Sequence, residues 1–103
     1  MKILITNILG RKTFDIVNIL KMHFSKNDLI LADSISSFRA NFFYEGLDYY
    51  ILRFENFHDD FEKIRVANID HDIIYIPIEE DITLLFYDYL RQKRPRNVLS
   101  TLP

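Results

Sequence analysis

The chain has 103 residues, of which 49% are hydrophobic and 27% charged, and its formal net charge is -2. This composition predicts one compact globular domain and excludes a long disordered chain. The mildly acidic balance argues against a dedicated nucleic-acid-binding protein, whose binding face is usually strongly basic. No cysteine is present, which excludes disulfides, thiol nucleophiles and thiolate metal sites. No apolar run approaches the roughly eighteen residues of a membrane span, and residues 1–5 are too short for a signal peptide, so we expect a cytoplasmic protein without membrane contact.

The first third of the chain alternates strand and helix patterns. Residues 2–6, KILIT, form an apolar run typical of a strand buried on both faces of a parallel sheet. A loop with Gly10 follows, and residues 13–24 repeat apolar side chains at helical spacing. Residues 29–32, LILA, predict a second buried strand that ends at Asp33.

The middle of the chain is less regular. Residues 35–47 mix turn formers with aromatics, so their state stays open, with a short helical turn around residues 37–42 as one alternative. Residues 48–53 have strand composition with mixed polarity, which favours an edge strand. Asn56 or His58 is a candidate cap for the helix that follows.

The last third repeats the alternation. Residues 73–76, IIYI, predict a fourth strand, which Pro77 ends. A helix follows, with acidic residues 79–81 at its start and basic residues 91–94 at its end, as the helix dipole favours. Strands that alternate with helices build parallel sheets through right-handed crossovers. We therefore predict an α/β fold, a small Rossmann-like three-layer domain over residues 1–103 with helices on both faces of a four-stranded parallel sheet.

Four blocks of sequence follow one another across nearly the whole chain: KILITNILGRKTFDIVNILKMH, DLILADS, LDYYILRFENFHDDFEKI and DHDIIYIPIEEDITLL. In order and spacing they resemble the N-terminal, pre-ATP-grasp domain of ATP-grasp ligases, the family of carbamoyl-phosphate synthase large subunits and related carboxylate-amine ligases. The resemblance implies strand order 3-2-1-4 and a substrate-side domain that is not catalytic alone. It also implies that residues 93–103 begin a linker.

In this family two further domains clamp ATP and magnesium, so the resemblance implies no cofactor in this chain but ATP and magnesium in the complete enzyme. It further implies partners: ATP-grasp domains in the same or a companion chain, and a small carboxylate substrate. A docking face left uncovered would expose Ile8, Leu9 and Ile78, from which we expect weak homodimerisation. The alternative function is a freestanding Rossmann-like interaction module without a ligand.

In the implied strand order the chain leaves strand one in opposite directions, so ligands are expected in the crevice beyond the carboxyl ends of strands one and four. The loops TNILGRK, residues 6–12, and PIEED, residues 77–81, should face each other there. The candidate substrate-binding residues are Gly10, Arg11, Glu80 and Asp81. No catalytic residue and no metal ligand is assigned.

Two interpretations of Gly10 stay open. With Arg11 and the first amides of the following helix it binds an anionic substrate group or orders the loop against the two further domains, or it only permits a tight turn. One glycine is no dinucleotide fingerprint, which needs the spacing G-x-G-x-x-G. By the resemblance, Asn7 stands where family members usually carry glycine, and Asn tolerates positive φ well enough to keep the turn.

Two interpretations of Glu80 and Asp81 stay open as well. The resemblance places acidic residues three and four positions after Pro77 in the substrate cleft, although Ile78 replaces the family's threonine. Alternatively, they form an acidic first helical turn that the dipole favours.

The remaining polar groups carry weaker signals. Asp33 resembles a ribose-binding acid, but the glycine fingerprint is missing. The His and Asp residues at 58–60 and 70–72 fit loop or cap positions better than a metal site. RQKRPR, residues 91–96, fits helix-end complementarity and a linker better than nucleic-acid contact.

Overall fold

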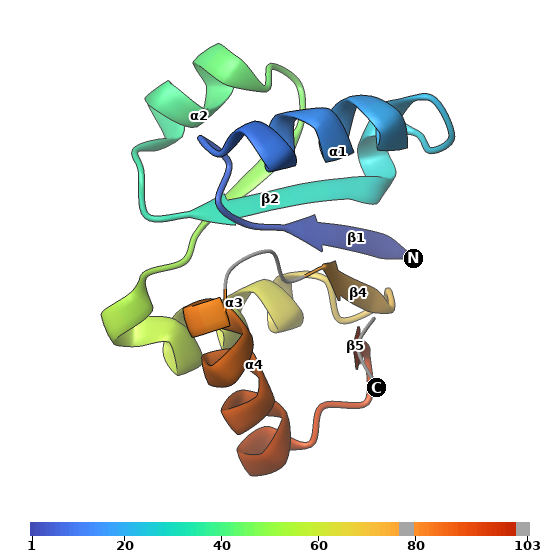
Figure 1. Cartoon of the computed structure of the whole chain (residues 1–103). Helices are drawn as coiled ribbons and strands as arrows, with labels where there is room; N and C mark the ends of the chain where they lie inside the picture. Colours follow the sequence, from blue (N-terminus) through green and yellow to red (C-terminus); the bar gives the residue numbers. More distant parts are fainter. Residues whose placement is uncertain (77–79, 101–103) are drawn as a thin grey trace.

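The computed structural model describes residues 1–76 and 80–100, and Figure 1 shows one sheet with helices above and below it. The strands are β1 (Lys2–Ile5), β2 (Leu29–Asp33), β3 (Asp48–Ile51), β4 (Ile73–Ile76) and β5 (Val98–Ser100). The helices are α1 (Arg11–Lys21), α2 (Ser37–Phe43), α3 (Phe57–Ala67) and α4 (Glu80–Lys93), with 3-10 turns at Lys26–Asp28 and Phe54–Asn56.

The sheet has five strands in the order β3-β2-β1-β4-β5, and every neighbouring pair is parallel. The predicted α/β class is confirmed, as are the adjacency of β1 and β4 and the edge position of β3. The prediction of four strands is wrong. Residues 98–100, which we expected to begin a linker, pair with residues 73–75 of β4. This strand is three residues long and follows a basic run, so the sequence pattern alone did not reveal it.

Strand β1 is buried on both faces, as predicted. Leu4 packs into the core on the side of α3 and α4, whereas Ile3 and Ile5 pack into the core on the side of α1 and α2. Successive side chains of a strand point to opposite faces, so this four-residue strand contributes to two separate cores. The central position of β1 therefore fixes where the loop at its carboxyl end lies.

The core under α3 and α4 is built largely from aromatic rings. Phe61 of α3 lies with its ring centroid 4.8 Å from that of Tyr89 and 5.5 Å from that of Phe86, both on α4. Tyr75 of β4 meets Phe86 edge to face at 4.7 Å. All four rings are fully buried. Edge-to-face and tilted contacts of this kind add stability beyond the area they bury.

The core under α1 and α2 is mainly aliphatic, with Val17, Leu31 and Ala40 buried in it. Helix α1 ends at Lys21, three residues before the predicted end, so Phe24 lies beyond the helix. The open segment 35–47 contains α2, a seven-residue helix whose N-cap Ser36 accepts a hydrogen bond from the Arg39 amide at 3.3 Å. No helix in the described part of the chain is long and apolar enough to cross a membrane.

Candidate functional site

The loop between β1 and α1 is a tight turn, closed by a hydrogen bond from the Gly10 amide to the Asn7 carbonyl at 2.9 Å. Asn7 has a φ of 55°, so the left-handed residue of the turn is Asn7, as its tolerance for positive φ predicts. Gly10 itself has an ordinary φ of -74°. What glycine supplies there is space, because a Cβ atom would lie 2.7 Å from Asn7 Nδ2. The backbone at Gly10 therefore lies close to a side chain of its own loop.

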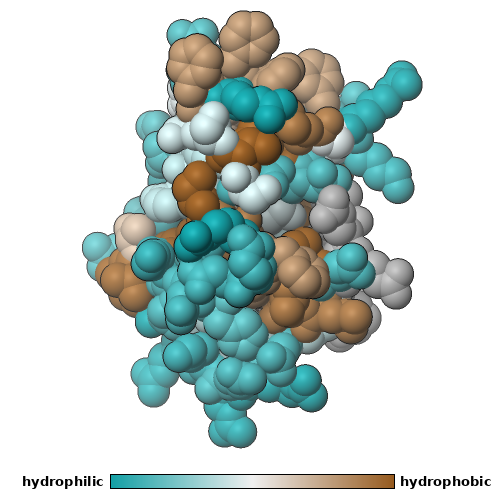
Figure 2. All heavy atoms as spheres, turned by 90° about the vertical axis from the view of Figure 1, so that its left-hand side faces the viewer, coloured by the Kyte–Doolittle hydropathy of each residue, from teal (hydrophilic) through white to brown (hydrophobic). Residues whose placement is uncertain are grey.

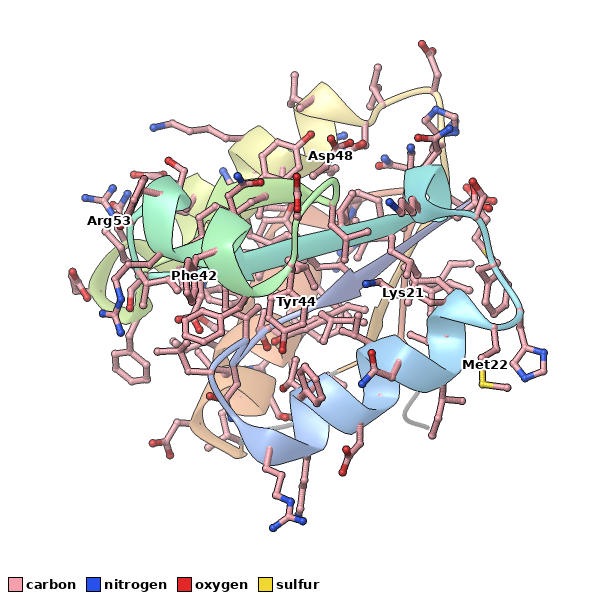
Figure 3. All side chains as sticks on the ribbon, turned by 90° about the horizontal axis from the view of Figure 1, so that it is seen from above. Lys21, Met22, Phe42, Tyr44, Asp48 and Arg53 are labelled. Atoms are coloured by element: carbon pink, nitrogen blue, oxygen red, sulfur yellow. The ribbon has the colours of Figure 1, made fainter. Side chains whose placement is uncertain are left out.

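Long-range hydrogen bonds hold this loop in place. The Ile8 amide donates to Asp33 Oδ2 at 3.0 Å, and the Tyr44 hydroxyl donates to the Ile8 carbonyl at 2.7 Å. Figure 3 shows Tyr44 between the end of α2 and the segment that leads into α1. Burial raises the pKa of Tyr44, so its hydroxyl keeps the proton that it donates. The loop is thus fixed by β2 and α2 as well as by its own turn.

The same contacts decide the role of Asp33. Its second carboxylate oxygen, Oδ1, accepts a hydrogen bond from the Ser34 amide at 2.7 Å. Both carboxylate oxygens therefore accept hydrogen bonds from backbone amides, and through the bond to Ile8 Asp33 positions the loop after β1. Tyr44 was missed by sequence reasoning, because it lies 36 residues from Ile8 and no local pattern links the two.

Buried hydroxyls tie the base of α1 to the sheet. Thr13 Oγ1 donates to the Thr6 carbonyl at 3.1 Å, and Thr6 Oγ1 lies 3.0 Å from the hydroxyl of Tyr75 in β4. All three residues are buried. Buried polar groups that find partners in this way fix one arrangement of their segments, here the start of α1 relative to β1 and β4.

The N-terminus of α1 is electropositive. Its N-cap is Gly10, which offers no side-chain oxygen to the first amides, and its first turn contains no acidic residue. Arg11 and Lys12 occupy that turn instead, although cations there are disfavoured by roughly 0.3–1 kcal/mol each. Arg11 is exposed and forms no ion pair with the described residues. An anion is the group that this terminus can stabilise.

A hollow of about 380 Å³ adjoins this terminus. It brings the predicted residues Gly10 and Arg11 together with Ile8 and Leu9, which we expected at a docking face, and with three aromatic side chains that the sequence did not single out, namely Phe14, Phe43 and Tyr44. Figure 2 looks at this edge of the molecule and shows apolar side chains gathered at the top, over α2, above a mainly polar surface. The hollow therefore combines one guanidinium with an apolar wall.

The other two predicted residues, Glu80 and Asp81, begin α4. Because β1 and β4 are parallel neighbours, α1 and α4 both start from the same edge of the sheet, on opposite faces (Figure 1). Asp81 is exposed, whereas the side chain of Glu80 and residues 77–79, with Pro77 and Ile78, lie outside the described residues. The expected facing of the two loops stays a prediction.

The His and Asp runs have different roles. Asp60 is buried and accepts hydrogen bonds from Arg53 and from Asn56 Nδ2, so it closes the turn before α3. These bonds, the Arg53 side chain first, lower the pKa of Asp60 to about 2. His58 lies 3.2 Å from Asp88 of α4. Within residues 1–76 and 80–100, no three His, Asp or Glu side chains form a group that could hold a metal ion.

Comparison with models of known protein families gave no match, and neither did a search of curated proteins. Function is therefore inferred from the chain's own residues and from the resemblance of its four sequence blocks.

Proposed function

We propose that this chain is the substrate-side N-terminal domain of an ATP-dependent carboxylate-amine ligase of the ATP-grasp class, with a Rossmann-like arrangement of its sheet. The observation that carries the proposal is the electropositive start of α1, with Arg11 beside the rigid loop that follows the central strand. Ligands of open α/β sheets bind beyond the carboxyl ends of the strands where the order reverses, and β1 is such a strand.

In this proposal the uncapped amides of α1 and the Arg11 guanidinium bind the carboxylate of the substrate. Such charge-assisted hydrogen bonds are about twice as strong as neutral ones. Fixing the loop through Asp33 and Tyr44 orients these donors before the substrate arrives, which reduces the entropic cost of binding. Phosphoryl transfer needs a triphosphate with its magnesium ions, and the ATP-grasp domains supply that machinery.

The test is made on the complete enzyme. The reading frame that encodes this chain, or an adjacent one, should encode an ATP-grasp domain, and the assembled protein should form ADP only when its carboxylate substrate is present. Arg11→Ala should raise KM for the carboxylate at least tenfold, while KM for ATP stays unchanged. A tenfold rise corresponds to a loss of about 1.4 kcal/mol of binding free energy. Lys21→Ala, at the other end of the same helix, is the matched control. Equal effects of the two substitutions would contradict the proposal.

Glu80→Ala and Asp81→Ala test the second half of the predicted site. If these carboxylates lie in the substrate cleft, their loss should lower kcat or raise KM for the amine while thermal melting stays normal. If they serve only the helix dipole, kinetics should stay unchanged and stability should fall by about 0.3–1 kcal/mol.

A freestanding interaction module is the second candidate, and the aromatic surface of α2 favours it. Phe38, Phe42 and Phe43 are all exposed, and Phe42 is 78% accessible. Exposed apolar patches of this kind mark contact surfaces. Of the residues expected to drive homodimerisation, Ile8 is only 2% accessible, so that expectation is wrong for Ile8, whereas Leu9 is 48% accessible. Ile8 is covered because its side chain packs into the core on the side of α1 and α2.

Sedimentation of the 103-residue chain distinguishes the two candidates. A contact module should associate with itself or a partner through α2, and Phe42→Ser should weaken that association. A ligase domain should instead self-associate only weakly, through its uncovered docking face with Leu9, so Phe42→Ser should leave that association unchanged.

A further inference from the structure

A second hollow, of about 520 Å³, lies at the opposite edge of the sheet. It is formed where α4 ends and the chain turns into β5, beside the second half of α3 (Figure 1). Its lining residues are Glu62, Arg65, Ile69, Lys93, Arg94, Pro95, Arg96 and Asn97. Because the amino ends of the strands meet here, this hollow is separate from the loop after β1, and a ligand bound in it would be independent of the proposed ligase function.

The hollow is strongly cationic in a chain whose net charge is -2. Four of its side chains are cationic and one is a carboxylate. That carboxylate, Glu62, is already paired with Arg65 and accepts a hydrogen bond from Tyr89 at 3.3 Å. Lys93, Arg94 and Arg96 are exposed and form no ion pair with the residues described here. Three cations thus share one concave surface without a counter-charge.

The neighbouring arginine on α4 behaves differently. Arg91 pairs with Asp88 at 3.3 Å, one turn earlier on the same helix. The helix dipole favours cations near a carboxyl terminus, and this explains part of the basic run. It does not explain why three further cations, unpaired within the described residues, gather on the surface of one hollow.

The backbone at the end of α4 carries a second signal. Arg94 has a φ of 46°, in the left-handed region where helices usually place glycine or asparagine, and its amide closes the helix on the Leu90 carbonyl at 3.0 Å. An arginine in this conformation is strained relative to glycine. A strained residue in a cationic hollow is the pattern expected when the side chain is retained for binding.

Asn97 forms a fixed part of the wall. Its side-chain Nδ2 donates to the backbone carbonyls of Asn68 at 3.4 Å and His71 at 3.2 Å. Its backbone carbonyl accepts a hydrogen bond from the Ile73 amide at 2.6 Å. Among the described residues, Asn97 Oδ1 is the one buried side-chain oxygen or nitrogen without a hydrogen-bond partner. That oxygen is enclosed, so the role of Asn97 is to hold the wall of the hollow in place through its backbone and amide contacts.

The side chains also select the class of anion. Three of the four cations are arginines, whose planar guanidinium groups match the paired oxygens of phosphate. No aromatic ring is among the lining residues of the described structure, so the stacking platform that single-stranded nucleic acids use is missing. The volume falls within the range of about 300–1,000 Å³ typical of small-molecule sites.

We propose that this hollow binds a phosphomonoester, with Lys93, Arg94 and Arg96 holding the phosphate. Two sources supply this chemistry: a free sugar phosphate and a phosphorylated side chain of another protein.

The test is an NMR titration of the 103-residue chain with two probes, ribose 5-phosphate and a short phosphoserine peptide of otherwise neutral composition. Amide signals of Lys93, Arg94, Arg96 and Asn97 should shift, with a dissociation constant below about 1 mM that rises with salt. The tighter-binding probe identifies the source. If neither probe shifts these signals, or if the shifts concentrate on residues 6–12, the proposal is overturned.

Variants separate binding from folding. Arg96→Gln should weaken binding of the probe about tenfold, whereas Arg91→Gln, on α4 and outside the hollow, should leave binding unchanged. Arg94→Gly removes both the cation and the strain, so this variant should melt at a higher temperature than the parent and yet bind about tenfold more weakly. Equal weakening by Arg91→Gln and Arg96→Gln would show a general charge effect and overturn the assigned site.

Discussion

The two faces of the sheet use aromatic side chains in opposite ways. On the face of α3 and α4, Phe57, Phe61, Phe86 and Tyr89 are buried in a shared core. On the face of α1 and α2, four phenylalanines are exposed, namely Phe14, Phe38, Phe42 and Phe43. Composition alone does not distinguish these groups. The difference teaches that the rings of α3 and α4 serve the core of their own face, whereas those of α1 and α2 are left at the surface.

The helices account for the difference. Helices α3 and α4 are 11 and 14 residues long, and they pack against each other as well as on the sheet. Helix α2 has seven residues, and Ala40 is its only buried residue. A helix this short covers little of its face and leaves its remaining rings in water.

The largest expected effect compares one ring from each face. Phe61→Ala removes a fully buried ring that contacts Tyr75, Phe86 and Tyr89, so it should lower the free energy of unfolding by about 3–5 kcal/mol. Phe42→Ala removes a ring that is mostly in water, so it should change the free energy of unfolding by no more than about 0.5 kcal/mol. Urea unfolding followed by circular dichroism measures both. A large loss in Phe42→Ala would mean that the comparison is wrong and that α2 supports the core.

The sequence predicted the better-packed face more fully. Helical spacing in α4 and the apolar run of β4 were sufficient to place both elements, because each buries a regular stripe or run. On the other face, the pattern around Phe38 and Phe42 stayed open, because large apolar residues usually indicate burial and here do not. The contacts that fix the loop after β1 could not be predicted, since Asp33 and Tyr44 reach it from distant segments.

Two neighbouring carboxylates of α3, Asp59 and Asp60, differ in the same way as the rings, one exposed and one buried. Asp60 closes the turn before α3, and hydrogen bonds from Arg53 lower its pKa to about 2 from the ordinary 3.8. A lowered pKa in the folded state means that the stabilisation is complete above pH 3.8 and is lost as the pH falls from 3.8 toward 2. Because Arg53 is half-exposed and solvent screens the pair, we expect about 1–2 kcal/mol.

Asp60→Asn should therefore lower the free energy of unfolding by about that amount at neutral pH, and the difference from the parent should shrink toward pH 2. Asp59→Asn, exposed in the same helical turn, is the control and should stay within about 0.5 kcal/mol at neutral pH. Urea unfolding between pH 2.5 and pH 7 measures the profile. A constant difference across this range would contradict the assigned role of the Arg53 pair.

The smallest expected effect tests whether the loop on the α1 side is as tightly built as the aromatic core. A Cβ at position 10 would lie 2.7 Å from Asn7 Nδ2 and 3.2 Å from the Asn7 carbonyl oxygen. Gly10→Ala should therefore destabilise the parent by about 0.5–1 kcal/mol, the lower end of overpacking costs. In an Asn7→Gly background the nearest atom is gone, but the carbonyl oxygen of residue 7 stays 3.2 Å away and glycine is the better N-cap. The same change should therefore destabilise by less, no more than about 0.5 kcal/mol. Thermal and urea unfolding of the four proteins in this cycle give the coupling. A smaller loss in the Asn7→Gly background would show that glycine is needed at position 10 for the room it leaves to Asn7. Equal effects in both backgrounds would mean that the loop adjusts freely and that the donors around Arg11 are not held in advance.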